Sequence, residues 1–313
     1  MTKAVAFGCA AWLLAGPALS AGKVPRDAYG RPDFEGLWTN ATETPIERPA
    51  SFSGPITGDA EAAAFEKASA AAFANDGDVV GSRQSEWWER GAPMVRIDGH
   101  FRTSLIVEPA DGKLPYSEAG RRLLTASQAA VFADFRGPES RPGPERCLMG
   151  GSGTTGAPIL PGNYTSIQQF VQTADHLAIA SEAMHAVRII PLGSRRAAPV
   201  EPRRWAGNSV GWWQGEMLVV ETRGFVAGEQ FKPPAAPYIS QDAVVTERFS
   251  RLRTGEILYE FSVDDPTAYS SPWRGQSLFR PSKGPMFEFA CHEGNYSLEG
   301  VLAGARQAEE AGK

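Results

Sequence analysis

The segment EILYEFSV at residues 256–263 shows the pattern that decides the fold. Its apolar and polar residues alternate, so Ile257, Tyr259 and Phe261 would share one face of an extended chain. Glutamate side chains would occupy the opposite face. A strand with one apolar and one polar face fits an antiparallel sheet that covers a core on one side.

Stretches of similar length and composition continue on both sides of this segment. Pairs such as Thr254-Gly255 and Gln214-Gly215 have the chemistry of hairpin turns. Many consecutive antiparallel strands predict a mainly β fold, a meander closed into a lipocalin-like barrel, with a β-sandwich as the alternative. The expected strands are residues 164–172, 177–182, 185–191, 215–222, 243–252, 256–263, 271–279 and 285–291.

The N-terminal half adds further strands and two helical insertions. Residues 33–39 (DFEGLWT) carry a Gly-x-Trp, which resembles the start of many lipocalin-type barrels, where the tryptophan plugs one end. An alanine-rich run without Gly or Pro predicts a helix over 59–74, and an apolar stripe predicts another over 117–135. Residues 100–108 have strand composition. Residues 137–161 are a Gly/Pro-rich loop, which we expect to form a pinned lid or rim.

The N-terminus has the features of a processing signal. Lys3 precedes an apolar run at residues 4–14, and small residues follow at positions 18 and 20. We therefore expect residues 1–20 to be a signal peptide, residues 21–313 to form a single domain, and the protein to be periplasmic or secreted. The apolar run is too short to span a bilayer, so stable membrane insertion is not expected.

Charge and cysteine content narrow the possible partners and the redox state. The chain carries 31 basic and 36 acidic residues, and this excess of acid disfavours nucleic acid as a partner. Removal of residues 1–20 leaves two cysteines, Cys147 and Cys291. In an oxidising compartment we expect them to form a disulfide. The alternatives are two free buried thiols or a nucleophilic cysteine beside His292.

Two short segments concentrate the groups that could carry chemistry. The segment FEFACHEGNY at residues 287–296 holds a thiol, an imidazole, a carboxylate, an amide and a phenol. On a strand His292 and Glu293 would point to opposite faces, whereas the turn suggested by the glycine after them would let both face a pocket. Asn295 and Tyr296 could hydrogen-bond a substrate oxygen.

The second segment is EAMHAVR at residues 182–188. If its Ala-Met pair is a two-residue hairpin turn, Glu182 and His185 are the closing pair and share one face. A carboxylate beside an imidazole fixes the tautomer that a general base needs. A bulged continuous strand and a structural ion pair are the alternatives. Arg188 could bind a substrate carboxylate or phenolate, or neutralise Glu182.

Several distinctive blocks of sequence are spread over residues 30–306. They read RTSLIV at 102–107, DGKLP at 111–115, ERC at 145–147, ExxHxxRII at 182–190, WxGEMLVVET at 213–222, ERFSR at 247–251, DDP at 264–266 and ACHEGNY at 290–296. This set resembles a large group of uncharacterised exported bacterial proteins, and its last block is the most specific. The resemblance implies a site at that block and no particular reaction. The chain departs from the pattern at 193–195, where Asp-Gly-Arg is common, and at Asn208, where Asp is common; these departures imply that a carboxylate at 208 is dispensable or that the substrate differs.

The favoured hypothesis is an exported enzyme that uses His185 and His292, oriented by Glu182 and Glu293, as acid and base. Elimination, isomerisation or hydration of a small, partly aromatic or hydrophobic substrate would fit these groups. No cofactor is expected. A divalent metal is the less favoured possibility, because the segment at 182–188 has strand rather than helix character. The alternatives are a lipocalin-like binding protein for a hydrophobic small molecule and a structural component without a pocket. The sequence does not set the oligomeric state.

Overall fold

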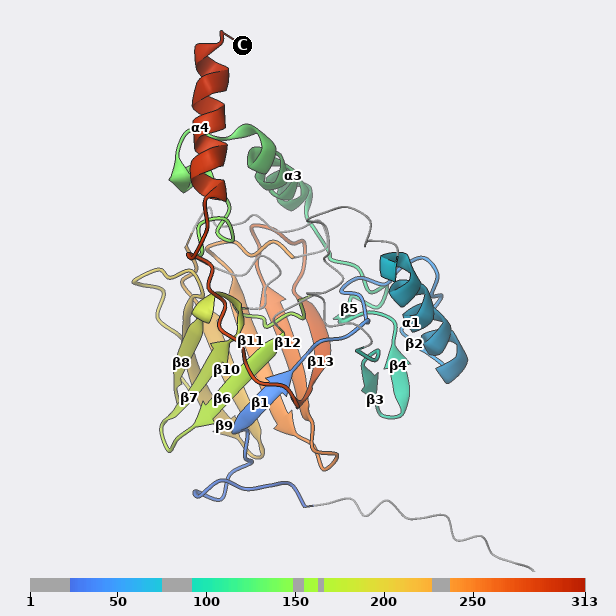
Figure 1. Ribbon diagram of the computed structural model, residues 1–313. Helices are drawn as coiled ribbons and strands as arrows, with labels where there is room; N and C mark the ends of the chain where they lie inside the picture. The colour runs from blue at the N-terminus through green and yellow to red at the C-terminus, as the bar shows by residue number, and fades with distance from the viewer. Residues whose placement is uncertain (1–22, 75–91, 149–154, 163–165, 227–236, 313) are drawn as a thin grey trace, which may run out of the picture.

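The computed structural model describes residues 23–74, 92–148, 155–162, 166–226 and 237–312. Within these ranges, ten strands form one antiparallel sheet that curls into a nearly closed barrel (Figure 1). The strands are β1 Gly36–Thr39, β5 Ile106–Glu108, β6 Ile167–Gln172, β7 His176–Ser181, β8 Val187–Pro191, β9 Asn208–Gln214, β10 Met217–Arg223, β11 Val244–Arg251, β12 Ile257–Asp264 and β13 Trp273–Pro281.

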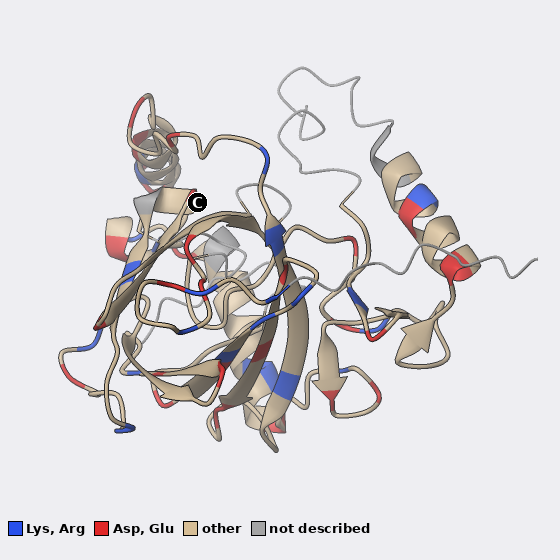
Figure 2. Ribbon diagram, turned by 90° about the horizontal axis from the view of Figure 1, so that it is seen from below, with Lys and Arg blue, Asp and Glu red and all other residues tan. Residues whose placement is uncertain are grey.

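The order along the sheet is β8-β7-β6-β1-β13-β12-β11-β10-β9, and β5 pairs with β13 outside this path. The predicted lipocalin-like barrel is therefore confirmed over the β-sandwich. Seen from below, the strands curve round in a ring (Figure 2). The first and last strands of the path meet at a short seam, where Leu192 and Gly211 form a parallel bridge. A Cβ on Gly211 would lie 2.7 Å from a methyl carbon of Leu192, so this close approach requires glycine.

Packed aromatic rings fill the barrel interior. The inward-facing side chains of β11, β12 and β13 continue the alternation seen in the sequence, and Phe249 and Tyr259 lie 5.0 Å apart between ring centroids. Phe170 on β6 meets Phe279 on β13, the strand on the other side of β1, with 5.4 Å between ring centroids. The fully buried aromatic side chains here are Phe34, Phe170, Phe249, Tyr259, Phe261, Trp273 and Phe279. This packing is the principal stabilising core of the described chain.

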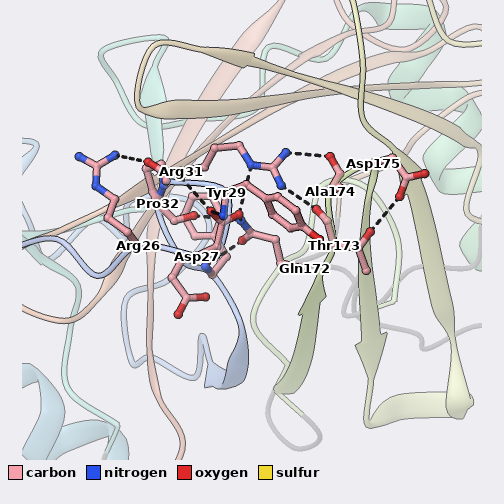
Figure 3. A network of polar contacts seen from close by, with 12 residues as sticks. Arg26, Asp27, Tyr29, Arg31, Pro32, Gln172, Thr173, Ala174 and Asp175 are labelled. Carbon is pink, nitrogen blue, oxygen red and sulfur yellow. Dashed lines mark hydrogen bonds and ion pairs between the residues drawn. The ribbon is translucent and has the colours of Figure 1, made fainter.

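The N-terminal residues 26–34 form a hook across one end of the barrel (Figure 3). The Asp27 carboxylate accepts hydrogen bonds from the Arg31 amide at 2.8 Å and from Gln172 Nε2 at 2.7 Å. The Arg31 guanidinium donates to the backbone carbonyls of residues 173 and 174, in the turn between β6 and β7. The hook thereby fixes the chain that leads into β1.

Trp38 anchors this end of the barrel, as its Gly-x-Trp predicts. Its side chain is only 3 % exposed, and its indole nitrogen donates to the Phe34 carbonyl at 2.8 Å. The Arg251 guanidinium lies 4.6 Å from the ring centroid. These contacts join the entry to β1 with the end of β11.

The predicted helical insertions are confirmed as α1 Asp59–Ala74 and α3 Glu118–Ala133. Ser117 caps α3 by accepting a hydrogen bond from the Gly120 amide. A further helix, α4 Ser297–Glu310, was not predicted and projects from the barrel end opposite the hook (Figure 1). Short 3-10 turns, η1 Pro138–Ser140 and η2 Ala183–His185, complete the helical elements of the described ranges.

The single strand predicted at residues 100–108 was wrong, because the chain turns there and enters two different sheets. β4 His100–Arg102 joins β2 Ile56–Thr57 and β3 Arg96–Ile97 in a small three-stranded sheet, whereas β5 joins the barrel. At the bend between β4 and β5, the buried Thr103 hydroxyl donates a hydrogen bond to the Gly54 carbonyl. This bond ties the bend to the loop that contains Gly54.

Two other expectations concern the N-terminus and the membrane. The predicted signal peptide at residues 1–20 lies outside the described residues. Among the helices that are described, none is both long and apolar enough to cross a bilayer.

Replacement of Trp38 by alanine should be among the costliest single changes. The Trp38→Ala variant removes a buried indole and its hydrogen bond, and we expect a loss of about 3–5 kcal/mol in the free energy of unfolding. Chemical denaturation measures it. Phe287→Ala is the matched control, because that ring is 69 % exposed and should cost under about 0.5 kcal/mol. A Trp38→Ala variant as stable as this control would contradict an anchoring role.

The hook predicts a specific pH dependence. Burial raises the pKa of Asp27, but hydrogen bonds from the Arg31 amide, Gln172 and the Tyr29 amide outweigh it, so the pKa lies below its usual value. Asp27 therefore stabilises the fold at pH values above its unfolded-state pKa of about 3.9, and this contribution is lost as the pH falls through the lower folded-state pKa.

We expect Asp27→Asn to lower the stability at pH 7, and the difference from wild type to shrink in acid. Denaturation curves collected from pH 7 downwards measure this difference. Asp98→Asn, at an exposed residue, is the control. A difference that stays constant down to about pH 2 would contradict the linkage.

Candidate functional site

The C-terminal segment 285–296 lies at the barrel end opposite the hook and is covalently fixed there. Cys147 and Cys291 form a disulfide with an S–S distance of 2.06 Å, across a sequence separation of 144 residues. The predicted pairing is confirmed. Asn295 Nδ2 also donates to the Glu145 carbonyl at 3.3 Å, which gives the segment a second attachment to the same loop.

A third attachment joins this segment to the connection between β7 and β8. The Glu182 carboxylate is buried and accepts a hydrogen bond from the Phe287 amide at 2.9 Å. The strand predicted at residues 285–291 was wrong, because this segment has no strand pairing in the structure. A side-chain carboxylate holds the Phe287 amide instead of a strand carbonyl.

The connection between β7 and β8 is wider than a two-residue hairpin. The last pairing is the hydrogen bond from the Ser181 amide to the Ala186 carbonyl, so Glu182 and His185 are not the closing pair. The 3-10 turn η2, Ala183–His185, lies in this connection, and Met184 within it has a φ of 57°. The side chain of His185 lies outside the described part of the structure.

A cavity of about 370 Å³ lies where these segments meet. It draws on three parts of the chain: the loop of the first cysteine, the turn η2 and the C-terminal segment. Both His292 and Glu293 line it, as expected for a turn rather than a strand, and Gly294 after them has a φ of 67°. The lining residues are Cys147, Met184, Glu288, Ala290, Cys291, His292 and Glu293.

The other predicted site residues lie apart from this cavity. The Tyr296 side chain is 78 % exposed. The Asn295 amide is used to hold the loop, as described above. Arg188 points into the barrel, where it belongs to a different cluster of polar groups.

Arg188 on β8 forms a buried ion pair with Glu247 on β11. Its two terminal nitrogens donate to the two carboxylate oxygens at 3.1 and 2.5 Å. The same guanidinium contacts the hydroxyl groups of Ser209 and Thr222, both at 3.2 Å, and the Gly156 carbonyl at 3.3 Å. Burial alone would lower the pKa of Arg188, but the Glu247 carboxylate outweighs it and the pKa is raised.

Tyr259 extends this cluster to the segment that fills the barrel end. Its hydroxyl donates to Glu247 at 2.8 Å and accepts from the Ile159 amide at 2.8 Å. Burial and the adjacent carboxylate raise the pKa of Tyr259 well above its usual range. Residues 155–160, from the end of the loop predicted as a lid or rim, are all buried here.

Glu247 was missing from the candidate residues, although the sequence holds a signal for it. It alternates with Val245 and Phe249, so it occupies an inward position on a strand whose other inward residues are apolar. A carboxylate on the apolar face of a strand needs a buried cation or hydrogen-bond donor. From this requirement one would predict an inward-facing arginine as the partner of Glu247, and Arg188 is that arginine.

The described residues hold no cluster of three or more His, Cys, Asp or Glu side chains arranged for a metal ion. The expectation of metal-independent chemistry stays a prediction.

Removal of one partner should show how strongly the buried pair is coupled. Arg188→Met leaves the Glu247 carboxylate buried without its cation, and we expect a loss of about 3–5 kcal/mol in stability. The double variant Arg188→Met/Glu247→Leu should lose less than the single variant, because no lone charge remains. Chemical denaturation of the four proteins of this cycle measures the coupling, and strictly additive losses would contradict it.

Comparisons with known proteins do not assign a function to this chain. No protein-family model matches the chain, and no curated protein matches it. The sequence resemblance to exported bacterial proteins stays a prediction. A functional conclusion therefore depends on the cavities and on the side chains that line them.

Proposed function

We propose that the protein is an exported enzyme that performs metal-independent acid–base chemistry in the cavity beside the Cys147–Cys291 disulfide. Elimination, isomerisation or hydration of a small, partly aromatic or hydrophobic substrate fits the groups there. One observation carries the proposal: an imidazole and two carboxylates, from His292, Glu293 and Glu288, line one cavity. Histidine and glutamate are the side chains most used for general acid and base catalysis.

The attachments of the cavity wall support this proposal. Proton transfer needs a donor or acceptor held within hydrogen-bond reach of the substrate. The disulfide fixes the residue before His292, and the bond from Glu182 to the Phe287 amide fixes the approach to it. Glu182 thus acts as a positioning residue for the segment.

The size and composition of the cavity fit a small substrate. A volume of about 370 Å³ falls in the usual range for small-molecule sites. Met184 and the disulfide offer apolar, polarisable surface beside the charged groups. A small molecule with a hydrophobic part and one acidic C–H or hydroxyl group would match both.

The lipocalin-like binding alternative would need a ligand site other than the described barrel interior. That interior contains the packed rings of residues such as Phe170, Phe249 and Tyr259. A ligand would therefore have to bind at the barrel end or on the outer surface.

Replacement of His292 tests the enzymatic proposal. His292→Ala should lower turnover by about 10²–10⁴-fold with an unchanged melting temperature, because this exposed imidazole contributes little packing. The substrate is sought by incubating the protein with small-molecule extracts of the host and recording by mass spectrometry which compounds change. His176→Ala is the matched control, because that histidine lies in the turn region beside Asp175, at the hook end of the barrel.

Equal turnover by wild type and His292→Ala, or an equal loss in His176→Ala, would contradict the assignment. Dialysis against a chelator separates the metal alternative. We expect turnover to survive it, whereas loss on chelation and recovery with a divalent metal would overturn metal independence.

A further inference from the structure

A second and larger cavity, of about 940 Å³, lies at the seam of the barrel. Its walls come from β8, from the start of β9 and from the loop at residues 196–207 that connects them. This is where the two ends of the sheet meet with few backbone hydrogen bonds. The volume is at the upper end of the range for small-molecule sites.

The charged side chains that described residues contribute to the lining of this cavity are all positive. Four arginines contribute to it, and no Asp or Glu is among the described lining residues, in a chain whose net charge is −5. Arg203 is engaged with the Glu201 carboxylate at 3.3 Å and with the carbonyls of Phe225 and Gln241. Arg196 and Arg204 are exposed and make no side-chain hydrogen bond or ion pair with any described residue. Two cations are therefore available to a ligand.

Apolar and aromatic surface lies beside these cations. Val187 and Ile189 are on the outer face of β8, are 56 % and 66 % exposed, and line the cavity. The half-buried ring of Trp205 also lines it. Exposed branched apolar side chains next to an indole make a surface that gains free energy when an apolar group covers it.

The buried side of the cavity offers a further donor. Arg188 and Ser209 line it as well, and the Arg188 side chain is about 95 % buried. Its Nε atom has no hydrogen-bond partner within the described chain, although the terminal nitrogens are engaged with Glu247. An unpaired buried donor costs free energy unless a partner reaches it.

We propose that this cavity binds a small organic anion, a carboxylate with an aromatic or aliphatic body. Arg196 and Arg204 bind the carboxylate, and Trp205 with the exposed apolar residues of β8 packs against the body. The guanidinium group matches a carboxylate with two parallel hydrogen bonds. This proposal does not rest on acid–base chemistry at His292, and either can fail without the other.

Calorimetric titration with defined probes tests the site. The probes are 1-naphthoate, decanoate, the neutral 1-naphthamide and inorganic phosphate, each added to the full protein. We expect one or both carboxylates to bind, and naphthamide to bind at least about tenfold more weakly than naphthoate. Preference for naphthoate identifies an aromatic body, and preference for decanoate an aliphatic one.

Variants then place the binding in this cavity. Arg196→Gln and Arg204→Gln should each weaken carboxylate binding by about tenfold or more, with circular dichroism unchanged. Arg253→Gln is the matched control, because Arg253 is an exposed arginine in the β11–β12 turn, outside the cavity, and should leave the affinity as in wild type. Trp205→Leu should weaken naphthoate more than phosphate.

Four outcomes would overturn the proposal. The first is no heat with either carboxylate up to millimolar concentration. The second is equal affinity for naphthoate and naphthamide, which would show that the negative charge of the ligand does not contribute to binding. The third is unchanged affinity in both the Arg196 and Arg204 variants, which would show that the ligand binds outside this cavity. Binding of inorganic phosphate as tight as that of the carboxylates would overturn the role of the apolar body.

Discussion

The buried pair of Arg188 and Glu247 is the interaction on which the rest of the structure depends. The pair crosses the barrel interior and joins β8, at one edge of the curled sheet, to β11. It therefore helps the short seam to hold the two ends of the sheet near each other. A buried charge pair is tolerated only when its remaining polar atoms find partners. The strand hydroxyls, Tyr259 and the segment 155–160 supply most of these partners, and barrel closure and filling of the barrel end therefore depend on each other.

Much of the fold could be predicted, because it follows from local periodicity. Alternation at 256–263 and its neighbours indicated an antiparallel barrel, and composition indicated the helices at 59–74 and 117–135. The disulfide followed from the cysteine count and the expected compartment. These inferences need only the residue types along the chain, so they are open to sequence reasoning.

The site was less accessible, because its geometry depends on partners far away in the sequence. The segment 285–291 has strand composition, yet the amide of Phe287 finds the Glu182 carboxylate and no strand. Whether Arg188 faces the core or a substrate depends on the register of β8 against β7. No periodic pattern marks the loop at 196–207 either, and its arginines converge only once the barrel has closed.

The position of β1 has a consequence for how the chain folds. This strand precedes the other described barrel strands in the chain, yet it pairs on one side with β13, which follows all of them. Until β13 has been made and has folded, one edge of β1 has no partner strand. The partner at its other edge, β6, is also distant in sequence. Contacts between such remote segments raise the contact order and slow folding. An incomplete chain would expose an open strand edge, and such edges promote aggregation. A chaperone that shields newly made β-strands would therefore benefit this protein more than a protein whose strands pair with near neighbours in sequence.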